Sequence, residues 1–180
     1  MDKKALVVLT NVGHYGDDPE KTGMWLAEAT EFVYKLKKAG IEIDYVSPKG
    51  GKVPLDPRSM KFPYASKMDY QIYKSIDFKM RALTNSLKPS DINPDEYFVI
   101  YYTGGHGTLW DYPKNLELQA IAEKIYAKGG YITSVCHGLA GLLNIKDAMG
   151  HYILAGRNIT GFTDQEELVG GRVKKVPYSV

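Results

Sequence analysis

The sequence of 180 residues has only one cysteine, Cys136. A single thiol excludes an intrachain disulfide and a metal site made of several cysteines. The chain also lacks a run of about 20 apolar residues, which a membrane-spanning helix needs. It has no large excess of either charge, because 23 basic and 21 acidic residues give a formal net charge of +2. Nucleic-acid binding needs a concentrated basic field, so we expect neither a nucleic-acid nor a membrane partner.

The N-terminus lacks the pattern of a secretory signal peptide. Its apolar run ends at Leu9, and the polar residues Asn11 and His14 follow. A signal peptide needs a longer apolar segment and a small-residue cleavage site, so we expect a cytoplasmic protein. The length is that of one domain, and no linker or internal repeat divides it. We therefore expect a single domain over residues 1–180.

Short apolar runs alternate with helical patterns along the chain. Continuous or alternating apolar runs predict strands, and apolar residues three and four positions apart predict helices. This alternation predicts an α/β fold, a doubly wound and mostly parallel sheet with helices on both faces. The expected strands are residues 5–9, 41–45, 97–102, 131–135, 152–154 and 158–162, and the expected helices are residues 25–36, about 67–87, 116–126 and 137–143.

Polar or small residues follow three of the expected strands: the loop after Leu9, residues 104–107, and residues 136–138. In open α/β sheets, ligands bind outside the carboxyl ends of the strands. The strand that ends at Val135 runs directly into Cys136, and a segment of small and apolar residues follows. This is the arrangement of a nucleophile elbow, a tight strand-to-helix turn that exposes a reactive side chain. We predict that Cys136 is a nucleophile rather than an inert buried thiol.

The surroundings of the cysteine predict how its chemistry is supported. A helix N-terminus and a nearby imidazolium would lower the pKa of the thiol. Neighbouring side chains on an elbow often point apart, so the side chain of His137 need not reach the sulfur. Its backbone N–H lies where an oxyanion hole needs a donor, and the amides of Gly104 and Gly105 can supply a second one.

Glu28 and two other histidines are further candidates. Glu28 lies at the margin of the apolar stripe of the first expected helix, where burial favours a protonated carboxyl able to shuttle a proton. His14 and His106 could line the site from two loops. The histidines show no recognised metal-ligand spacing, so we expect no metal site.

Five segments spread over nearly the whole chain form a specific set when taken in order. They are residues 21–28 (KTGMWLAE), 53–59 (VPLDPRS), 104–107 (GGHG), 135–138 (VCHG) and 160–167 (TGFTDQEE). In these segments the chain resembles the ThiJ/PfpI superfamily, and within it the branch of glyoxalase III and heat-shock chaperones. The resemblance implies a flavodoxin-like, class I glutamine-amidotransferase-like fold.

The resemblance also implies a catalytic triad. Cys136 matches the nucleophile, and His137 matches the histidine beside it. Glu167 matches the acid that orients this histidine, and Glu166, one position away, is the alternative.

The remaining roles and the reaction follow from the same resemblance. Glu28 matches a buried carboxyl that hydrogen-bonds to the cysteine, and Gly105 and His137 match the donors of the oxyanion hole. The implied reaction is the cofactor-independent conversion of methylglyoxal, or a related 2-oxoaldehyde, to a 2-hydroxy acid such as D-lactate. The partner is therefore a small aldehyde substrate.

The C-terminal part departs from the family pattern. Thirteen residues follow Glu167, whereas family members continue with another strand and helix, which we expect this chain to lack. A missing core element exposes apolar surface. We therefore expect weak positioning of Glu167 and a homodimer or other homo-oligomer that covers the open surface.

Three other functions are compatible with the same residues. The triad and oxyanion hole could serve a cysteine peptidase or amidase. Exposed apolar patches would suit a non-enzymatic holdase chaperone. Oxidation of Cys136 next to Glu28 would suit a redox sensor.

Overall fold

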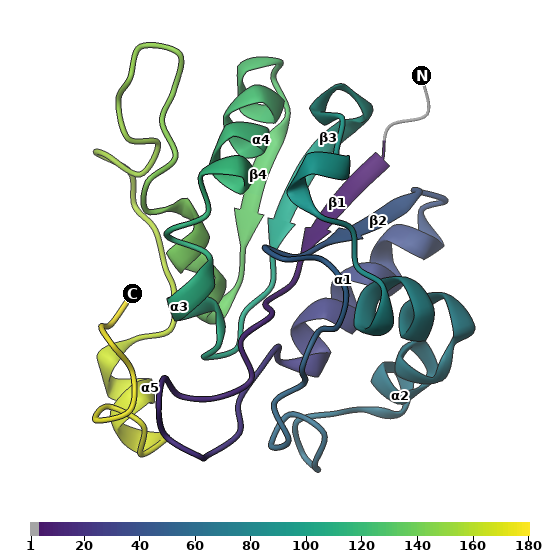
Figure 1. The fold of residues 1–180 in the computed structure, drawn as a ribbon, viewed down its shortest axis with the longest axis vertical. Helices are drawn as coiled ribbons and strands as arrows, with labels where there is room; N and C mark the ends of the chain where they lie inside the picture. Colours follow the sequence, from purple (N-terminus) through teal and green to yellow (C-terminus); the bar gives the residue numbers. More distant parts are fainter. Residues whose placement is uncertain (1–3) are drawn as a thin grey trace.

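The computed structural model describes residues 4–180 and has a four-stranded sheet at its centre (Figure 1). The strands are β1 (Lys4–Val8), β2 (Ile43–Val46), β3 (Tyr97–Tyr102) and β4 (Tyr131–Ser134). Their order is β2-β1-β3-β4, and every neighbouring pair is parallel. The chain thus moves outward from β1 in both directions, which confirms the doubly wound α/β fold.

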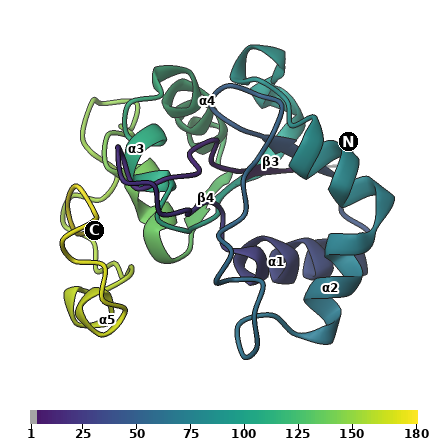
Figure 2. The same cartoon turned by 60° about the horizontal axis from the view of Figure 1, so that its bottom comes forward.

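Helices cover both faces of this sheet (Figure 2). The helices are α1 (Leu26–Lys38), α2 (Lys67–Lys74), α3 (Thr108–Asp111), α4 (Leu116–Ala127) and α5 (Asp164–Val169). On β1, Ala5 and Val7 pack into the apolar cluster beneath α1 and α2, while Leu6 and Val8 pack into the opposite cluster beneath α4. A strand buried on both faces needs apolar residues at every position, which explains the continuous apolar run.

Two of the expected strands are wrong. Residues 158–162 have no regular secondary structure, and Tyr152 makes only an isolated bridge with Lys146. Ile153 and Leu154 instead pack from a turn against the α4 side of the core. Their apolar character therefore reflects burial of a loop, since a run of three residues does not distinguish a strand from a packed turn.

Two of the expected helices differ in form. The segment from residue 67 to 87 is divided at Ser75, whose extended backbone ends α2, and a π-helical segment follows at Phe78–Thr84. The segment after Cys136 is a 3₁₀ helix, Cys136–Leu142. Short 3₁₀ helices also occur at Pro89–Asp91 and Pro94–Glu96.

The carboxyl ends of β1, β3 and β4 meet at one edge of the sheet, where the loops after them lie together (Figure 1). The C-terminal segment with α5 returns to this same edge (Figure 2). Within residues 4–180, no helix is long and apolar enough to cross a membrane.

Candidate active site

Cys136 lies on a strained turn at the end of β4. Its φ is 52°, the one non-glycine residue between residues 4 and 180 with a positive φ. This conformation costs an L-residue about 1–2 kcal/mol, and such strain is concentrated at functional sites. The N–H of Gly138 donates to the carbonyl of Val135 at 2.8 Å and closes the turn. The backbone therefore has the form of the nucleophile elbow expected from the sequence.

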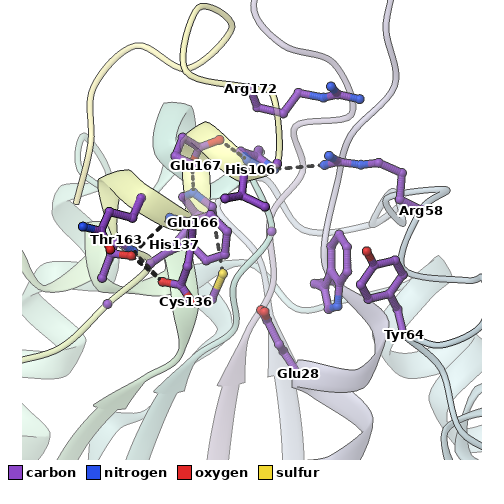
Figure 3. Close-up of a pocket in the computed structure, with 17 residues that line it drawn as sticks. Glu28, Arg58, Tyr64, His106, Cys136, His137, Thr163, Glu166, Glu167 and Arg172 are labelled. Atoms are coloured by element: carbon purple, nitrogen blue, oxygen red, sulfur yellow. Dashed lines mark hydrogen bonds and ion pairs between the residues drawn. The ribbon is translucent and has the colours of Figure 1, made fainter.

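The ring of His137 joins the thiol to a carboxylate (Figure 3). Its Nδ1 lies 3.2 Å from Cys136 Sγ, and its Nε2 lies 2.7 Å from Glu167 Oε2. Since a carboxylate only accepts hydrogen bonds, Nε2 carries the proton and Nδ1 presents its lone pair to the thiol. The side chain thus reaches the sulfur, although the elbow geometry did not require it.

Glu167, rather than Glu166, meets the histidine. Thr163 and Glu166 form a capping box at the start of α5, with Glu166 Oε2 accepting from the Thr163 N–H at 2.9 Å. The cap turns Glu166 to solvent and places the next residue on the buried side, where Glu167 is only 4% exposed. The capping box therefore explains why Glu167 and not Glu166 faces His137, a choice that the sequence pattern left open.

The segment around α5 is tied to the rest of the molecule by charges. Lys175 Nζ contacts Asp18 at 2.9 Å, and Arg172 Nη2 contacts Glu20 at 2.6 Å. These contacts join the C-terminal segment to the loop after β1. Together with the cap of α5, they connect the segment that carries Glu167 to the rest of the fold. Weak positioning of Glu167 stays a prediction.

A second histidine, His106, also binds Glu167. Its Nε2 lies 2.9 Å from Glu167 Oε1, and its Nδ1 lies 3.0 Å from Arg58 Nη2 and 3.2 Å from Tyr15 Oη. From the sequence, His106 was expected only to line the site from the glycine-rich loop. The available signal was its position in the glycine-rich loop directly after β3.

Glu28 approaches the cysteine from α1, on the side away from His137 (Figure 3). A Cβ added at Gly104 would overlap Glu28 Oε2 and lie 2.9 Å from Cys136 Cβ, so the carboxyl and the cysteine meet across this glycine. Glu28 Oε2 is buried and has no hydrogen-bond partner among residues 4–180. Burial raises the pKa of Glu28 to about 8, so the carboxyl is largely protonated at neutral pH.

The pKa of the thiol differs from the sequence expectation. Burial, and then the charge of an ionised Glu28, raise the pKa of Cys136 above that of an ordinary cysteine. The backbone N–H groups of His137 and Gly105 oppose this rise by hydrogen bonding toward the sulfur. The expected low pKa is therefore wrong for the resting site, because the elbow buries the sulfur as well as pointing it at donors.

The same burial prepares His137 to take the thiol proton. Burial and the neighbouring His106 lower the pKa of His137 to about 4. The ring is therefore neutral at pH 7, with its lone pair on the sulfur. A thiol of high pKa beside a neutral, carboxylate-bound imidazole is a pair in which the proton moves as the nucleophile attacks.

Gly105 has the conformation that an oxyanion donor needs here. Its φ is 99°, a region that side chains rarely adopt, and a Cβ would overlap the backbone oxygen of Gly23. With no side chain, its N–H can turn toward the sulfur beside that of His137. A carbonyl oxygen bound at the sulfur would meet two backbone donors, which is the usual composition of an oxyanion hole.

Comparison with known proteins places this site in a family. The pattern of the DJ-1/PfpI family matches residues 21–176. The chain belongs to the DJ-1/PfpI family. It is 37% identical to the glutathione-independent glyoxalase HSP31 of Saccharomyces cerevisiae over 172 residues, which cover 94% of this chain and 72% of that protein.

Two solved structures of similar sequence share this DJ-1/PfpI fold. The Rapid Encystment Protein of 24 kDa from Francisella tularensis has a TM-score of 0.90 and 37% identity, covering 99% of this chain and 78% of that one. Glyoxalase III from Candida albicans has a TM-score of 0.87 and 35% identity, covering 96% and 73%. These comparisons confirm the family resemblance read from the five sequence segments.

A cavity of about 960 Å³ opens over the cysteine of this DJ-1/PfpI chain. Cys136 and Glu28 lie in it, and Trp25, Arg58 and Tyr64 form part of its lining. The guanidinium carbon of Arg58 lies 5.6 Å from the ring centre of Trp25, within cation–π distance. Apolar and charged groups therefore surround a single nucleophile.

Three side chains of the site have atoms close enough to bind a metal ion. One ligand atom from each of His106, His137 and Glu167 lies within 4.8 Å of the others. Arg58 opposes metal binding, because its guanidinium donates to His106 Nδ1 and leaves the proton on Nε2, the nitrogen that faces Glu167. A metal would have to displace that proton beside a fixed positive charge.

Proposed function

We propose that this DJ-1/PfpI chain is a glutathione-independent glyoxalase, which converts methylglyoxal or a related 2-oxoaldehyde to a 2-hydroxy acid, D-lactate. The observation that carries the proposal is the contact of Cys136 Sγ with His137 at 3.2 Å beside the carboxyl of Glu28. A nucleophile, its base and a separate proton carrier meet in one cavity. Proteins named glutathione-independent glyoxalase and glyoxalase III are 35–37% identical to this chain.

The reaction begins with attack on the aldehyde carbon. A bond forms between Cys136 Sγ and C1 of the substrate while the thiol proton passes to His137 Nδ1. The electron pair of the C=O bond goes to the oxygen, which the N–H groups of Gly105 and His137 hold. Glu167 stabilises the imidazolium that forms. The product of this step is the oxyanion of a hemithioacetal, with the former thiol proton on His137.

A proton must then move from C1 to C2. The ionised fraction of Glu28 suits this step, because a carboxylate whose pKa is about 8 can take a proton and return it near neutral pH. As Glu28 takes the C1 proton, the imidazolium of His137 gives its proton to the oxygen on C2, and an enediolate forms. Return of the proton from Glu28 to C2 then gives the thioester of the 2-hydroxy acid. Water then cleaves the thioester and restores the thiol, so that methylglyoxal and one water become lactate.

A cysteine peptidase or amidase is the second candidate. The cavity of about 960 Å³ is larger than methylglyoxal requires, and the same thiol, imidazole and backbone donors can attack an amide. Glu28 distinguishes the two candidates, because amide hydrolysis moves no proton from one carbon to another and does not require this carboxyl.

We also propose a cytoplasmic location and a homo-oligomer. A nucleophilic thiol needs a reducing compartment to remain reduced. Exposed apolar side chains around the C-terminal third support self-association. They are Met149 at 77% exposure, Ile159 at 51% and Val169 at 90%.

The test is an assay of the purified chain with methylglyoxal in the absence of glutathione, alongside a general fluorogenic peptide. We expect D-lactate from the first and no cleavage of the second. Glu28→Gln should lose lactate formation, whereas peptide cleavage that survives Glu28→Gln would instead establish the peptidase. Inertness of the chain toward both substrates would contradict the enzymatic proposal.

A further inference from the structure

Glu167 has one more partner than a Cys–His–acid triad requires. His137 occupies its Oε2 at 2.7 Å, and His106 occupies its Oε1 at 2.9 Å. The two imidazole rings lie against each other with their centres 4.2 Å apart. All three residues are at most 5% exposed. A buried histidine that binds the acid of the triad from its other side has no part in the steps described above.

The partners of His106 define its protonation. Arg58 Nη2 lies 3.0 Å from His106 Nδ1, and a guanidinium has only donors. Nδ1 must therefore accept, which leaves the proton of the neutral ring on Nε2, facing Glu167. Arg58 itself is fixed by Asp56, which is fully buried and contacts Arg58 Nη2 at 2.7 Å.

This arrangement extends to the thiol. Because His106 occupies Glu167 Oε1, only Oε2 remains directed at His137 Nε2, and the His137 ring turns its Nδ1 lone pair to the sulfur. We propose that His106 is a positioning residue for the reaction of Cys136, with Arg58 keeping its Nδ1 unprotonated. The effect on catalysis rests on the proposed glyoxalase function, whereas the tautomers do not.

A change at His106 has a definite electrostatic consequence. The hydrogen bond from His106 withdraws charge from Glu167, and His106 lowers the pKa of His137. Removing the His106 side chain strengthens the electrostatic attraction between Glu167 and a protonated His137. The pKa of His137 therefore rises from about 4. The ionisable groups around the two rings are Glu166 and Glu167 of α5, Arg58 and Asp56 of the loop after β2, Tyr15, Glu28 of α1, and Cys136.

The kinetic test compares His106→Ala, His106→Gln and the control His151→Ala. The His151 side chain is 68% exposed, and the charged group that it contacts is Asp147, which is not part of this network. We expect His106→Ala to lower kcat for methylglyoxal about 10- to 100-fold with little change in KM, since a charge-assisted hydrogen bond is lost. His106→Gln, which keeps a neutral donor and an acceptor, should recover part of kcat.

The pH profile separates positioning from a general loss of structure. With His106→Ala, kcat/KM at pH 5 relative to pH 7.5 should fall below the wild-type ratio, because His137 now becomes protonated in this range. His151→Ala should keep the wild-type ratio. An unchanged ratio in His106→Ala, or an unchanged kcat, would overturn the positioning role.

Nitrogen NMR of the histidine rings tests the same proposal without using activity. In the wild-type chain at pH 7, both His106 and His137 should carry their proton on Nε2. Arg58→Met removes the guanidinium beside Nδ1 and should raise the pH at which His106 takes up a second proton, while Nε2 keeps its proton toward Glu167 and the fold, followed by circular dichroism, persists. A wild-type His106 protonated on Nδ1 would refute the assignment, even if the chain proves not to be a glyoxalase.

Discussion

Replacing Glu28 with Gln should stabilise the protein at high pH while it removes the proton carrier of the site. The folded structure raises the pKa of Glu28 from 4.5 to about 8, and burial is the main cause. A carboxyl whose pKa is raised by folding stays protonated in the folded state while it ionises in the unfolded chain. The contribution of Glu28 to stability is therefore fully present below pH 4.5 and is lost as the pH rises toward 8.

The magnitude follows from this pKa. One pKa unit corresponds to about 1.4 kcal/mol, so the rise from 4.5 to about 8 costs on the order of 5 kcal/mol once both states are ionised. At pH 5 most of the cost is absent, and less than about 1 kcal/mol remains. A glutamine has nearly the same shape and no charge, so Glu28→Gln should escape the cost at pH 8.5 and gain little at pH 5.

Urea unfolding at the two pH values measures this difference, with Glu31→Gln as the control. Glu31 lies one turn further along α1 and is exposed. We expect Glu28→Gln to be more stable than wild type by several kcal/mol at pH 8.5, and Glu31→Gln to follow wild type at both values. Lactate formation by Glu28→Gln should fall at least about 100-fold, the usual scale of general acid–base catalysis. A free energy of unfolding that depends on pH equally in wild type and Glu28→Gln would refute the reasoning.

Three further changes test other parts of the site. Thr163→Ala removes the cap of α5. It should cost about 1 kcal/mol of stability, measured by thermal unfolding. In methylglyoxal kinetics it should lower kcat by a larger factor than it changes KM. Gly105→Ala introduces a Cβ that overlaps Gly23 and displaces an oxyanion donor; urea unfolding should show a loss above about 2 kcal/mol, and wild-type stability would contradict the geometry. Burial raises the pKa of Asp111 from 3.8 to about 7, so stability from its protonated form is lost as the pH rises between these values; Asp111→Asn should raise the Tm at pH 8 more than at pH 5, and an equal change at both would count against this.

The elements nearest the cysteine could be predicted because local patterns define them. β4 and Val135 lead into Cys136, and a strand followed at once by a nucleophile and small residues can be recognised from the local sequence. The central strands were equally clear, since burial on both faces demands continuous apolar residues. The segment at residues 152–154 has the same local character, yet it packs as a turn.

The partners of Glu167 were harder to predict, because long-range packing brings them together. His137 and Glu167 are 30 positions apart, and His106 and Glu167 are 61 apart. No local spacing marks such pairs, and the family resemblance supplied only the first. The raised pKa of Cys136 was also hard to predict, because the sequence shows the turn but not how deeply the sulfur is buried.

The most direct test of the central claim uses the fact that the chain has one cysteine. The protein is alkylated in steps with iodoacetamide, the modified fraction is measured by intact-protein mass spectrometry, and glutathione-free conversion of methylglyoxal to D-lactate is assayed at each step. We predict that activity falls in proportion to the modified fraction and reaches zero when every Cys136 is modified. Full lactate formation by completely alkylated protein would contradict the claim that Cys136 is the nucleophile.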